Sequence, residues 1–422
     1  MARSVRNCKS GTTRQSWLEA VRPTGEVCVK VHDRMHALPR IGLDIMGDLA
    51  DEVGNGAYRL ENADSDIPPP AIAIKATREA VGRDEFNSWL PLVGLRELRA
   101  AVAHRVEQDT GLRYDWPSEV IITNGAQEGL FSTILALIGP GDGVITPEPA
   151  YSGIINRIRL AHGVPQFVPL VESEDWALDL DALRRRVDRT TKAIIINPTN
   201  MPTGKVFTRA ELDAIAALAI EHDLWVIDDQ PSRHMIFSGA KAHDIATWPG
   251  MRERTIMVGS VSKDFNLTAW RIGWTIGPKA VIEHVGKAHM YNGTLTSAFA
   301  QAGVIALLND EAALKDDIRI RVGILEVRAN VTAAGLNAIE GLSCVPAQGG
   351  WWCLLDHRAI EPDAEAFAHR LLKEANVAVT PMATWGPSTA MGHVRIIFAN
   401  EPVGRLRAAV DAIGRVARAA RR

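Results

Sequence analysis

The chain has 422 residues, of which 46% are hydrophobic and 23% charged, a balance typical of a globular protein with two or three domains. The net charge of −3 gives no electrostatic case for binding nucleic acid, and no stretch approaches the ~20 apolar residues that cross a membrane. Four irregularly spaced cysteines match no metal site and indicate a reducing, cytoplasmic compartment.

The first 80 residues divide into two segments. Residues 1–37 show no clear periodicity, and we expect an N-terminal arm there. In residues 38–80, apolar side chains recur every four positions from Ile41 to Val53, as on an amphipathic helix, and the prolines of ENADSDIPPP then indicate a loop. We expect this second segment to contribute to a small domain.

Apolar runs alternate with helical patterns from residue 81 to residue 309. The expected strands are EVIITNG, GVITPEP, KAIIINPTN, LWVIDDQ and RTIMVGS. This alternation predicts a large domain with a mainly parallel sheet, covered by helices on both faces, in which ligands bind at the carboxyl ends of the strands. Residues 310–422 begin with a long charged helical pattern followed by shorter segments, which predicts a smaller α+β domain.

The segment SVSKDFNLTAWRIGW, after the last of these strands, carries the residues that best indicate chemistry. Lys263 lies beside the hydroxyl groups of Ser260 and Ser262, and Arg271 follows. A lysine that is partly removed from water can act as a free amine toward a carbonyl group. Hydroxyl and guanidinium groups beside it suit a phosphate.

This segment resembles the cofactor motif of the class I/II aminotransferases, a family of fold-type I pyridoxal-phosphate (PLP) enzymes. Ser-x-Ser-Lys followed by Arg-x-Gly is matched at every position, and the resemblance covers about residues 38 to 415. It implies the α/β architecture just described, PLP bound to Lys263 as a Schiff base, and a homodimer. The implied reaction exchanges the amino group of an L-amino acid with a 2-oxo acid.

Further residues match the family in the same order. Asp228, at the end of LWVID, matches the acid that pairs with the pyridine nitrogen of PLP, although a strand-end aspartate can also cap a turn. In NGAQEGL, the backbone of Gly125, Ala126 and Gln127 matches the phosphate loop at a helix N-terminus.

Two side chains and one strand complete the resemblance. Tyr151 matches the aromatic residue that stacks on the cofactor, with core packing as the alternative, and Arg395 matches the arginine that binds the substrate α-carboxylate. The segment GGWWCLL resembles a strand that packs near the substrate.

The sequence also departs from the family. Asn200 is the candidate for a hydrogen bond to the cofactor's 3′-oxygen, but Met201 is an extra residue that a bulge must absorb, and Asn197 is left to serve the turn. Pro231 stands where the family has a tyrosine that reaches the same oxygen, and proline cannot donate a hydrogen bond. Trp89 stands where the family has a tyrosine that reaches the phosphate in the partner subunit. The segment 294–297 is also expected to reach the partner's cofactor.

The missing tyrosine keeps a second interpretation open, a PLP-dependent lyase, cyclase or oxidase built on the same fold. His234 is either an acid–base group that partly replaces the tyrosine or an ordinary surface histidine. A third interpretation is a non-catalytic regulator with this fold. It requires a DNA-binding domain, for which the arm is too short.

Overall fold

The computed structural model describes residues 32–36, 38–39, 42–388 and 391–421. Contacts divide the chain into two compact units, Met1–Arg40 and Ile41–Arg422. In the first unit the described residues include one short helix, α1 (Asp33–His36), and most of the expected N-terminal arm lies outside the described residues. The second unit contains everything discussed below.

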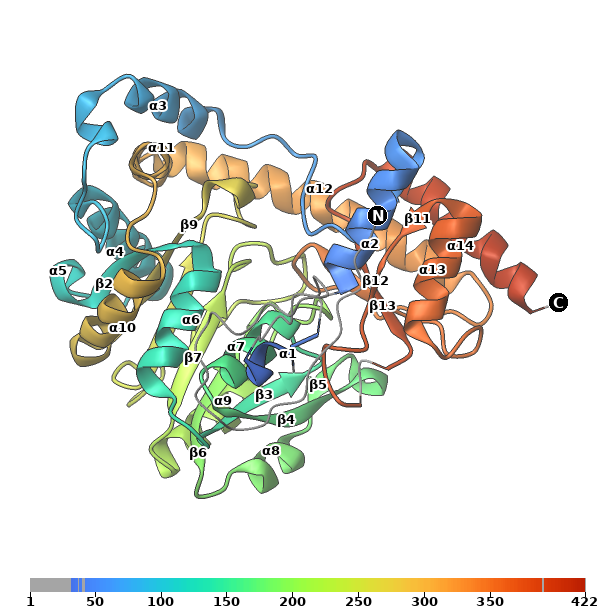
Figure 1. Cartoon of the computed structure of the whole chain (residues 1–422), viewed down its shortest axis with the longest axis horizontal. Helices are drawn as coiled ribbons and strands as arrows, with labels where there is room; N and C mark the ends of the chain where they lie inside the picture. The colour runs from blue at the N-terminus through green and yellow to red at the C-terminus, as the bar shows by residue number, and fades with distance from the viewer. Residues whose placement is uncertain (1–31, 37, 40–41, 389–390, 422) are drawn as a thin grey trace, which may run out of the picture. The chain divides into compact units, whose positions relative to one another are not determined.

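An eight-stranded sheet forms the centre of the second unit (Figure 1). Its strands, in spatial order, are β2 (Val120–Asn124), β9 (Ile272–Ile276), β8 (Thr255–Ser260), β7 (Trp225–Gln230), β6 (Thr191–Ile196), β3 (Gly143–Glu148), β4 (Val164–Val171) and β5 (Ala177–Leu178). Only β9 and β5 run against the other strands of this sheet. The prediction of a mainly parallel sheet is therefore confirmed.

Helices cover both faces of this sheet because its strands are apolar on both sides. One face packs against α6 (Gly125–Leu137), α7 (Ser152–Leu160) and α10 (Lys279–Asn292). The other face packs against α4 (Arg96–Thr110), α9 (Arg209–Glu221) and α11 (Ala298–Asn309). The short helices α5 (Trp116–Glu119) and α8 (Leu180–Arg186) lie at its margins, and α3 (Ala71–Val81) packs against α11.

Neighbouring residues of β7 point to opposite faces, as the period of two in a strand requires. Val226 packs in the core that includes Leu212 and Ile215 of α9, whereas Ile227 packs in the core that includes Leu130 of α6. This alternation decides which acidic residue at the end of β7 reaches the α6 side.

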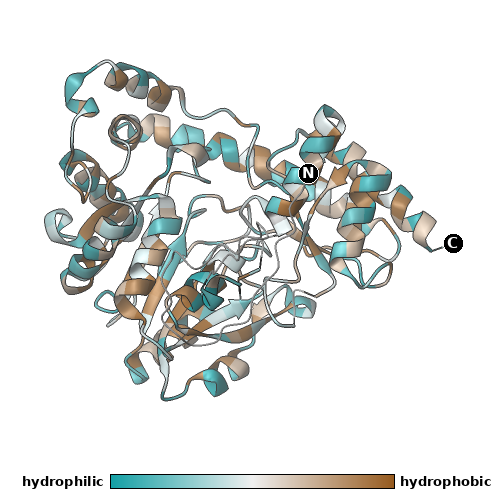
Figure 2. Cartoon of the chain, in the orientation of Figure 1, coloured by the Kyte–Doolittle hydropathy of each residue, from teal (hydrophilic) through white to brown (hydrophobic). Residues whose placement is uncertain are grey.

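The remaining elements form a second layer of smaller sheets. Strands β10 (Trp352–Asp356), β13 (His393–Ile397) and β12 (Thr380–Pro381) are antiparallel, and β1 (Tyr58–Arg59) pairs in parallel with β11 (Val377–Ala378). Helices α2 (Gly42–Val53), α12 (Glu311–Asn337), α13 (Ala364–Ala375) and α14 (Val403–Ala420) accompany them. In Figure 2, α12 and α14 carry hydrophilic and hydrophobic residues side by side, as helices with one buried face do.

Helix α12 joins the two layers. Leu314, in its first turns, packs in the core that includes α4 and α11, whereas Leu336, near its end, packs in the core beneath the smaller sheets. Contacts hold residues 41–422 together as one unit, so the domain boundaries predicted after residues 80 and 309 stay a prediction. The long helix expected after residue 310 is confirmed.

Candidate active site

A cavity lies at the carboxyl ends of the central strands, where the parallel sheet predicts a ligand site. It is lined by residues that follow β3, β6 and β8, by the start of α6, and by β7, β10 and β13. The structure brings the following sequence-predicted residues together on its wall: Ala126, Gln127, Tyr151, Ser260, Ser262, Lys263, Arg271 and Arg395.

Lys263 places its amine in the cavity. Its Nζ donates a hydrogen bond to the carbonyl oxygen of Ala63 at 2.5 Å and lies 4.6 Å from the ring centre of Trp351. Burial lowers the pKa of Lys263 to about 7, and the charge of Arg395 adds to this effect. A substantial fraction of this amine is therefore neutral near pH 7, as a carbonyl-trapping lysine needs.

The start of α6 and Arg271 form a cradle for an anion. Gly125 has a φ of +74°, and the Arg271 guanidinium occupies the space that a Cβ would fill. Arg271 donates to the backbone oxygens of Thr268, at 2.7 Å, and Asn124, at 3.3 Å. The free N–H groups of the first helical turn and this guanidinium point to a bound phosphate.

Arg395 is a buried cation with unused donors. Its Nη2 donates to the Glu61 carbonyl oxygen at 2.8 Å and to Thr380 Oγ1 at 3.1 Å. Its Nε and Nη1 find no partner among the described residues, and its guanidinium lies 4.9 Å from the ring centre of Trp385. Burial lowers the pKa of Arg395 to about 10, so it stays charged at neutral pH. A buried, half-satisfied guanidinium requires an anion, and a carboxylate matches its geometry.

The structure does not place Asp228 on the cavity wall, as the sequence predicted, and places its neighbour there instead. Asp229 lines the cavity, because it lies on the same face of β7 as Ile227 and α6. Asp228 points to the other face, where its carboxylate accepts from Gln230 Nε2 at 2.8 Å. Burial raises the pKa of Asp229 to about 7, and its Oδ1 has no partner among the described atoms. A ligand's ring N–H would supply that partner.

The structure also corrects the prediction for Asn200. Its side-chain oxygen accepts from the backbone N–H and hydroxyl of Thr203, so it serves the turn and does not line the cavity. Met201 and Asn197 line the cavity instead. The segment closes through an isolated bridge between Thr199 and Val206, so a loop, not a strand bulge, absorbs the extra residue.

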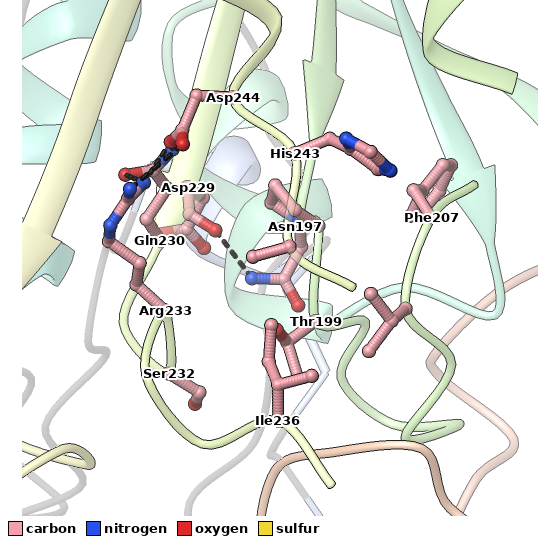
Figure 3. A pocket seen from close by; sticks show the side chains of 13 residues that line it. Asn197, Thr199, Phe207, Asp229, Gln230, Ser232, Arg233, Ile236, His243 and Asp244 are labelled. Atoms are coloured by element: carbon pink, nitrogen blue, oxygen red, sulfur yellow. Dashed lines mark hydrogen bonds and ion pairs between the residues drawn. The ribbon is translucent and has the colours of Figure 1, made fainter. Parts of the chain in front are cut away.

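Asn197 ties the end of β6 to the end of β7. Its Nδ2 donates to the backbone oxygen of Asp229 at 2.6 Å, the contact drawn in Figure 3. A smaller pocket behind this contact is lined by Asn197, Asp229 and Ser232. Counted from Asp229, the family's tyrosine position falls on Ser232, not on Pro231. The Ser232 hydroxyl is buried and has no partner among the described residues.

Three predicted groups do not reach the cavity of this chain. Trp89 is 73% exposed, and the segment 294–297 is likewise absent from the cavity wall. His234 is held between two aspartates outside the cavity, so it is not an acid–base group of the cavity and agrees with the alternative of a histidine whose ring nitrogens are satisfied. Gly125 has no Cβ, and the Arg271 guanidinium occupies the space that a Cβ would need.

Sequence reasoning missed several residues of the cavity wall. Ala63, Ile154 and Thr268 carry no motif of their own, and only the fold brings them there. Trp352 fits the expectation for GGWWCLL, because it lines the cavity and its indole N–H donates to the Asn200 carbonyl oxygen at 2.8 Å.

An α/β fold with a low-pKa lysine, a phosphate cradle and a buried acid around one cavity defines the fold-type I class of PLP enzymes. The model of the family "Aminotransferase class I and II" matches residues 52–413, and the chain belongs to this family. It is a PLP-dependent aminotransferase, and the residues of its cavity fit the cofactor. Among the described residues, no helix is long and apolar enough to cross a membrane.

Known aminotransferases are similar to this chain over nearly its full length. The chain is 31% identical to an aspartate/prephenate aminotransferase of Thermus thermophilus, covering 94% of this chain and 97% of that protein. It is 34% identical to an aspartate aminotransferase of Pyrococcus abyssi, covering 89% and 94%. The solved structure of N-succinyldiaminopimelate aminotransferase from Mycobacterium tuberculosis aligns with a TM-score of 0.86 at 31% identity, covering 92% of this chain and all of that chain (100%).

Proposed function

We propose that Arg395 binds the α-carboxylate of the amino acid while Lys263 holds PLP and moves the substrate's Cα proton. The observation that carries this proposal is the pairing of a buried arginine, with two groups left unbonded among the described residues, and a low-pKa lysine on one cavity wall. The arginine fixes the substrate's orientation, and holding the reacting groups in the correct geometry supplies much of the rate enhancement of an enzyme.

When bound, PLP supplies an electron-accepting ring that stabilises negative charge at the substrate's Cα. Lys263 Nζ, neutral in part near pH 7, takes the proton from Cα and returns it. Asp229 would hold a proton at the ring nitrogen of PLP, and Tyr151 would pack against the ring. The start of α6, with Ser260, Ser262 and Arg271, would hold the phosphate.

The cavity favours an amino acid with an uncharged side chain. The described cations on its wall are Lys263, Arg271 and Arg395, and the roles above use all three. The wall also offers Ile154, Met201 and Trp352. A second carboxylate on the substrate would find no further cation on the described wall, and burying it unpaired would be costly.

The active protein is proposed to be a homodimer in the cytoplasm. The exposed indole of Trp89 supports the dimer, because it lies off the cavity of its own chain while its sequence position matches a residue that reaches the partner's phosphate. Both described cysteines, Cys344 and Cys353, are buried and free, which supports a reducing compartment.

The test is the visible absorption of the purified, PLP-loaded protein before and after adding single amino acids, with no 2-oxo acid. An aminotransferase consumes one equivalent per site, loses its yellow colour and regains it on adding a 2-oxo acid. Lys263→Ala should lack the lysine-linked band from the start. A yellow form that turns over many equivalents without a 2-oxo acid would instead indicate the lyase, cyclase or oxidase chemistry.

A further inference from the structure

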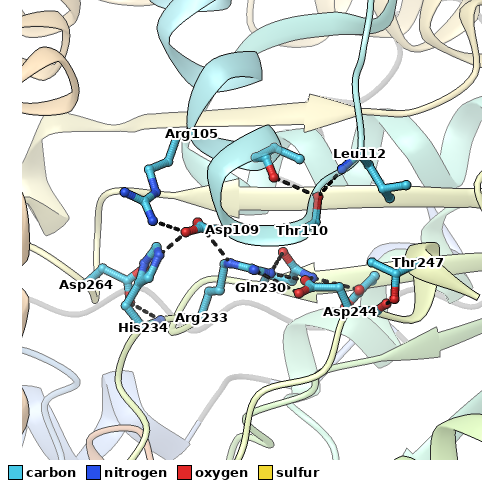
Figure 4. A network of polar contacts seen from close by, with 12 residues as sticks. Arg105, Asp109, Thr110, Leu112, Gln230, Arg233, His234, Asp244, Thr247 and Asp264 are labelled. Atoms are coloured by element: carbon cyan, nitrogen blue, oxygen red, sulfur yellow. Dashed lines mark hydrogen bonds and ion pairs between the residues drawn. The ribbon is translucent and has the colours of Figure 1, made fainter. Parts of the chain in front are cut away.

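A partly buried cluster of charged side chains lies beside the active site and takes no part in the chemistry proposed above. We define the polar cluster as Arg105 and Asp109 of α4, Arg233, His234 and Asp244 after β7, and Asp264 after β8. Figure 4 shows these residues converging from three separate stretches of the chain. Such a cluster is costly to bury, so its geometry must serve a purpose or be fully compensated.

His234 stands between two aspartates of the polar cluster. Its Nδ1 lies 2.7 Å from Asp264 Oδ2, and its Nε2 lies 3.1 Å from Asp109 Oδ2. The backbone N–H of His234 donates to Asp264 Oδ1 at 3.2 Å, so both oxygens of Asp264 are held by one residue. Carboxylate oxygens only accept, and the doubly protonated ring can donate to both at once.

The other charges around His234 balance one another. Asp109 also pairs with Arg105 and, at 3.3 Å, with Arg233 Nε. Arg233 in turn pairs with Asp244, with Nη2 2.8 Å from Oδ2. With His234 protonated, three cations (Arg105, Arg233 and His234) face three aspartates (Asp109, Asp244 and Asp264). Asp228 borders these charges, because Gln230 donates to both Asp228 and Asp244. Burial raises the pKa of Asp228 to about 7. The negative charge of Glu311, in α12, acts on Arg105.

The polar cluster touches the chain immediately next to Lys263. Asp264, its anchor, directly follows Lys263 and is 3% exposed. The same segment bears Phe265 and Asn266, whose side chain donates to the Ser65 carbonyl oxygen at 3.0 Å. Two adjacent side chains of this segment are thus held by hydrogen bonds: the Asp264 carboxylate accepts from His234, and the Lys263 amine donates to the carbonyl oxygen of Ala63.

We infer that His234 is a positioning residue for Lys263, acting through Asp264. The inference rests on the proposed role of Lys263. His234 holds the Asp264 carboxylate, and this contact keeps the neighbouring Lys263 side chain directed into the cavity. Burial is the main reason that this amine is neutral near pH 7, so a displaced or hydrated Lys263 would lose that property.

Two substitutions of His234 distinguish the contact made by its Nδ1 from the contact made by its Nε2. The amide nitrogen of asparagine falls near the position of Nδ1, and that of glutamine near Nε2. His234→Asn therefore keeps a side-chain donor for Asp264 Oδ2, whereas His234→Gln keeps the side-chain donor for Asp109 and leaves Asp264 only the backbone N–H. Asp264→Asn keeps the shape but removes the charge that His234 holds.

The experiment starts from the full-length protein stripped of PLP, to which PLP is added at a series of pH values. The visible band of the lysine-bound cofactor is followed over time, together with the thermal unfolding midpoint of each variant. The parent protein should react with a midpoint near pH 7, the pKa of its lysine. His234→Asn should stay near that midpoint, whereas His234→Gln and Asp264→Asn should shift it upward by about one pH unit and react roughly tenfold more slowly at pH 6.

The outcomes are distinguishable. If the parent forms no lysine-dependent band, the proposed function itself fails. If the parent forms the band but His234→Gln and His234→Asn share the parent's midpoint, the positioning role is wrong, even where both lose thermal stability. An equal upward shift in both histidine variants would also overturn it, because the contact with Asp264 would then not be the one that matters.

Discussion

Asp229 lines the cavity and Asp228 does not, because neighbouring residues of β7 point to opposite faces. Asp229→Asn should lower kcat/KM for amino-group transfer by roughly 10²-fold or more, because an amide cannot keep the ring nitrogen protonated. Asp228→Asn should change kcat/KM by less than about threefold, since its carboxylate lies on the opposite face and contacts Gln230. Steady-state kinetics of the two variants measure this difference, and equal losses would contradict the assignment to Asp229.

Arg395 should prove irreplaceable by lysine. A lysine keeps the charge but loses the planar fork that binds a carboxylate through two parallel hydrogen bonds. One charge-assisted hydrogen bond contributes about 1.5–3 kcal/mol, so Arg395→Lys should raise the KM for the amino acid by roughly 10- to 100-fold. Titration with a plain amine that lacks the carboxylate serves as the control. Its affinity should not change, and a parallel loss would indicate general disruption.

The sequence predicts Asp228 instead of Asp229, because it does not show which of the two side chains faces the cavity. In LWVIDD both aspartates end an apolar strand, and the strand is apolar on both faces. No hydrophobic alternation therefore tells which of the two faces α6. Lys263, Arg271 and Arg395 were predictable because each stands in a distinctive motif, whereas Asn200 and Met201 depend on how one turn closes.

At the scale of elements, the strand–helix junction at Gly125 should be sensitive for two separable reasons. Its φ of +74° strains any other residue, and a Cβ there would strike the Arg271 guanidinium. Gly111, at the end of α4, has a φ of +76° but open space where a Cβ would lie. Both substitutions to alanine should cost about 1 kcal/mol of stability through the backbone.

Only Gly125→Ala should also weaken PLP binding, by roughly tenfold, because it displaces Arg271 from the phosphate cradle. Equilibrium dialysis with PLP gives the affinity, and chemical unfolding gives the stability. Equal PLP affinity in the two variants would mean that the junction is only a turn. A large loss for Gly111→Ala would mean that PLP affinity follows stability alone.

Elements were predicted better than their arrangement. The strands and the 27-residue helix α12 follow from periodicity. The order of the sheet, with antiparallel β9 between β2 and β8, depends on contacts between segments far apart in sequence. No local pattern encodes those contacts, so the alternation of strands and helices predicted a mainly parallel sheet but not the order of its strands.

At the scale of the whole molecule, the proposed homodimer brings Trp89 to the active site of the partner subunit. The indole is 73% exposed, off its own cavity, while a donor N–H can bind phosphate. Trp89→Ala should therefore weaken PLP retention by roughly tenfold, the effect of one charge-assisted hydrogen bond. Sedimentation should give a dimer for both the parent and the variant.

Mixing two defective variants tests the direction of this contact. In a hybrid of Lys263→Ala and Trp89→Ala protomers, the site with an intact lysine receives the intact tryptophan of its partner. Because a random mixture contains about half hybrids, tight lysine-dependent PLP binding should appear in the mixture although neither variant shows it alone. If Trp89 acted within its own chain, every lysine-bearing site would still lack its indole, and mixing the two variants would restore nothing.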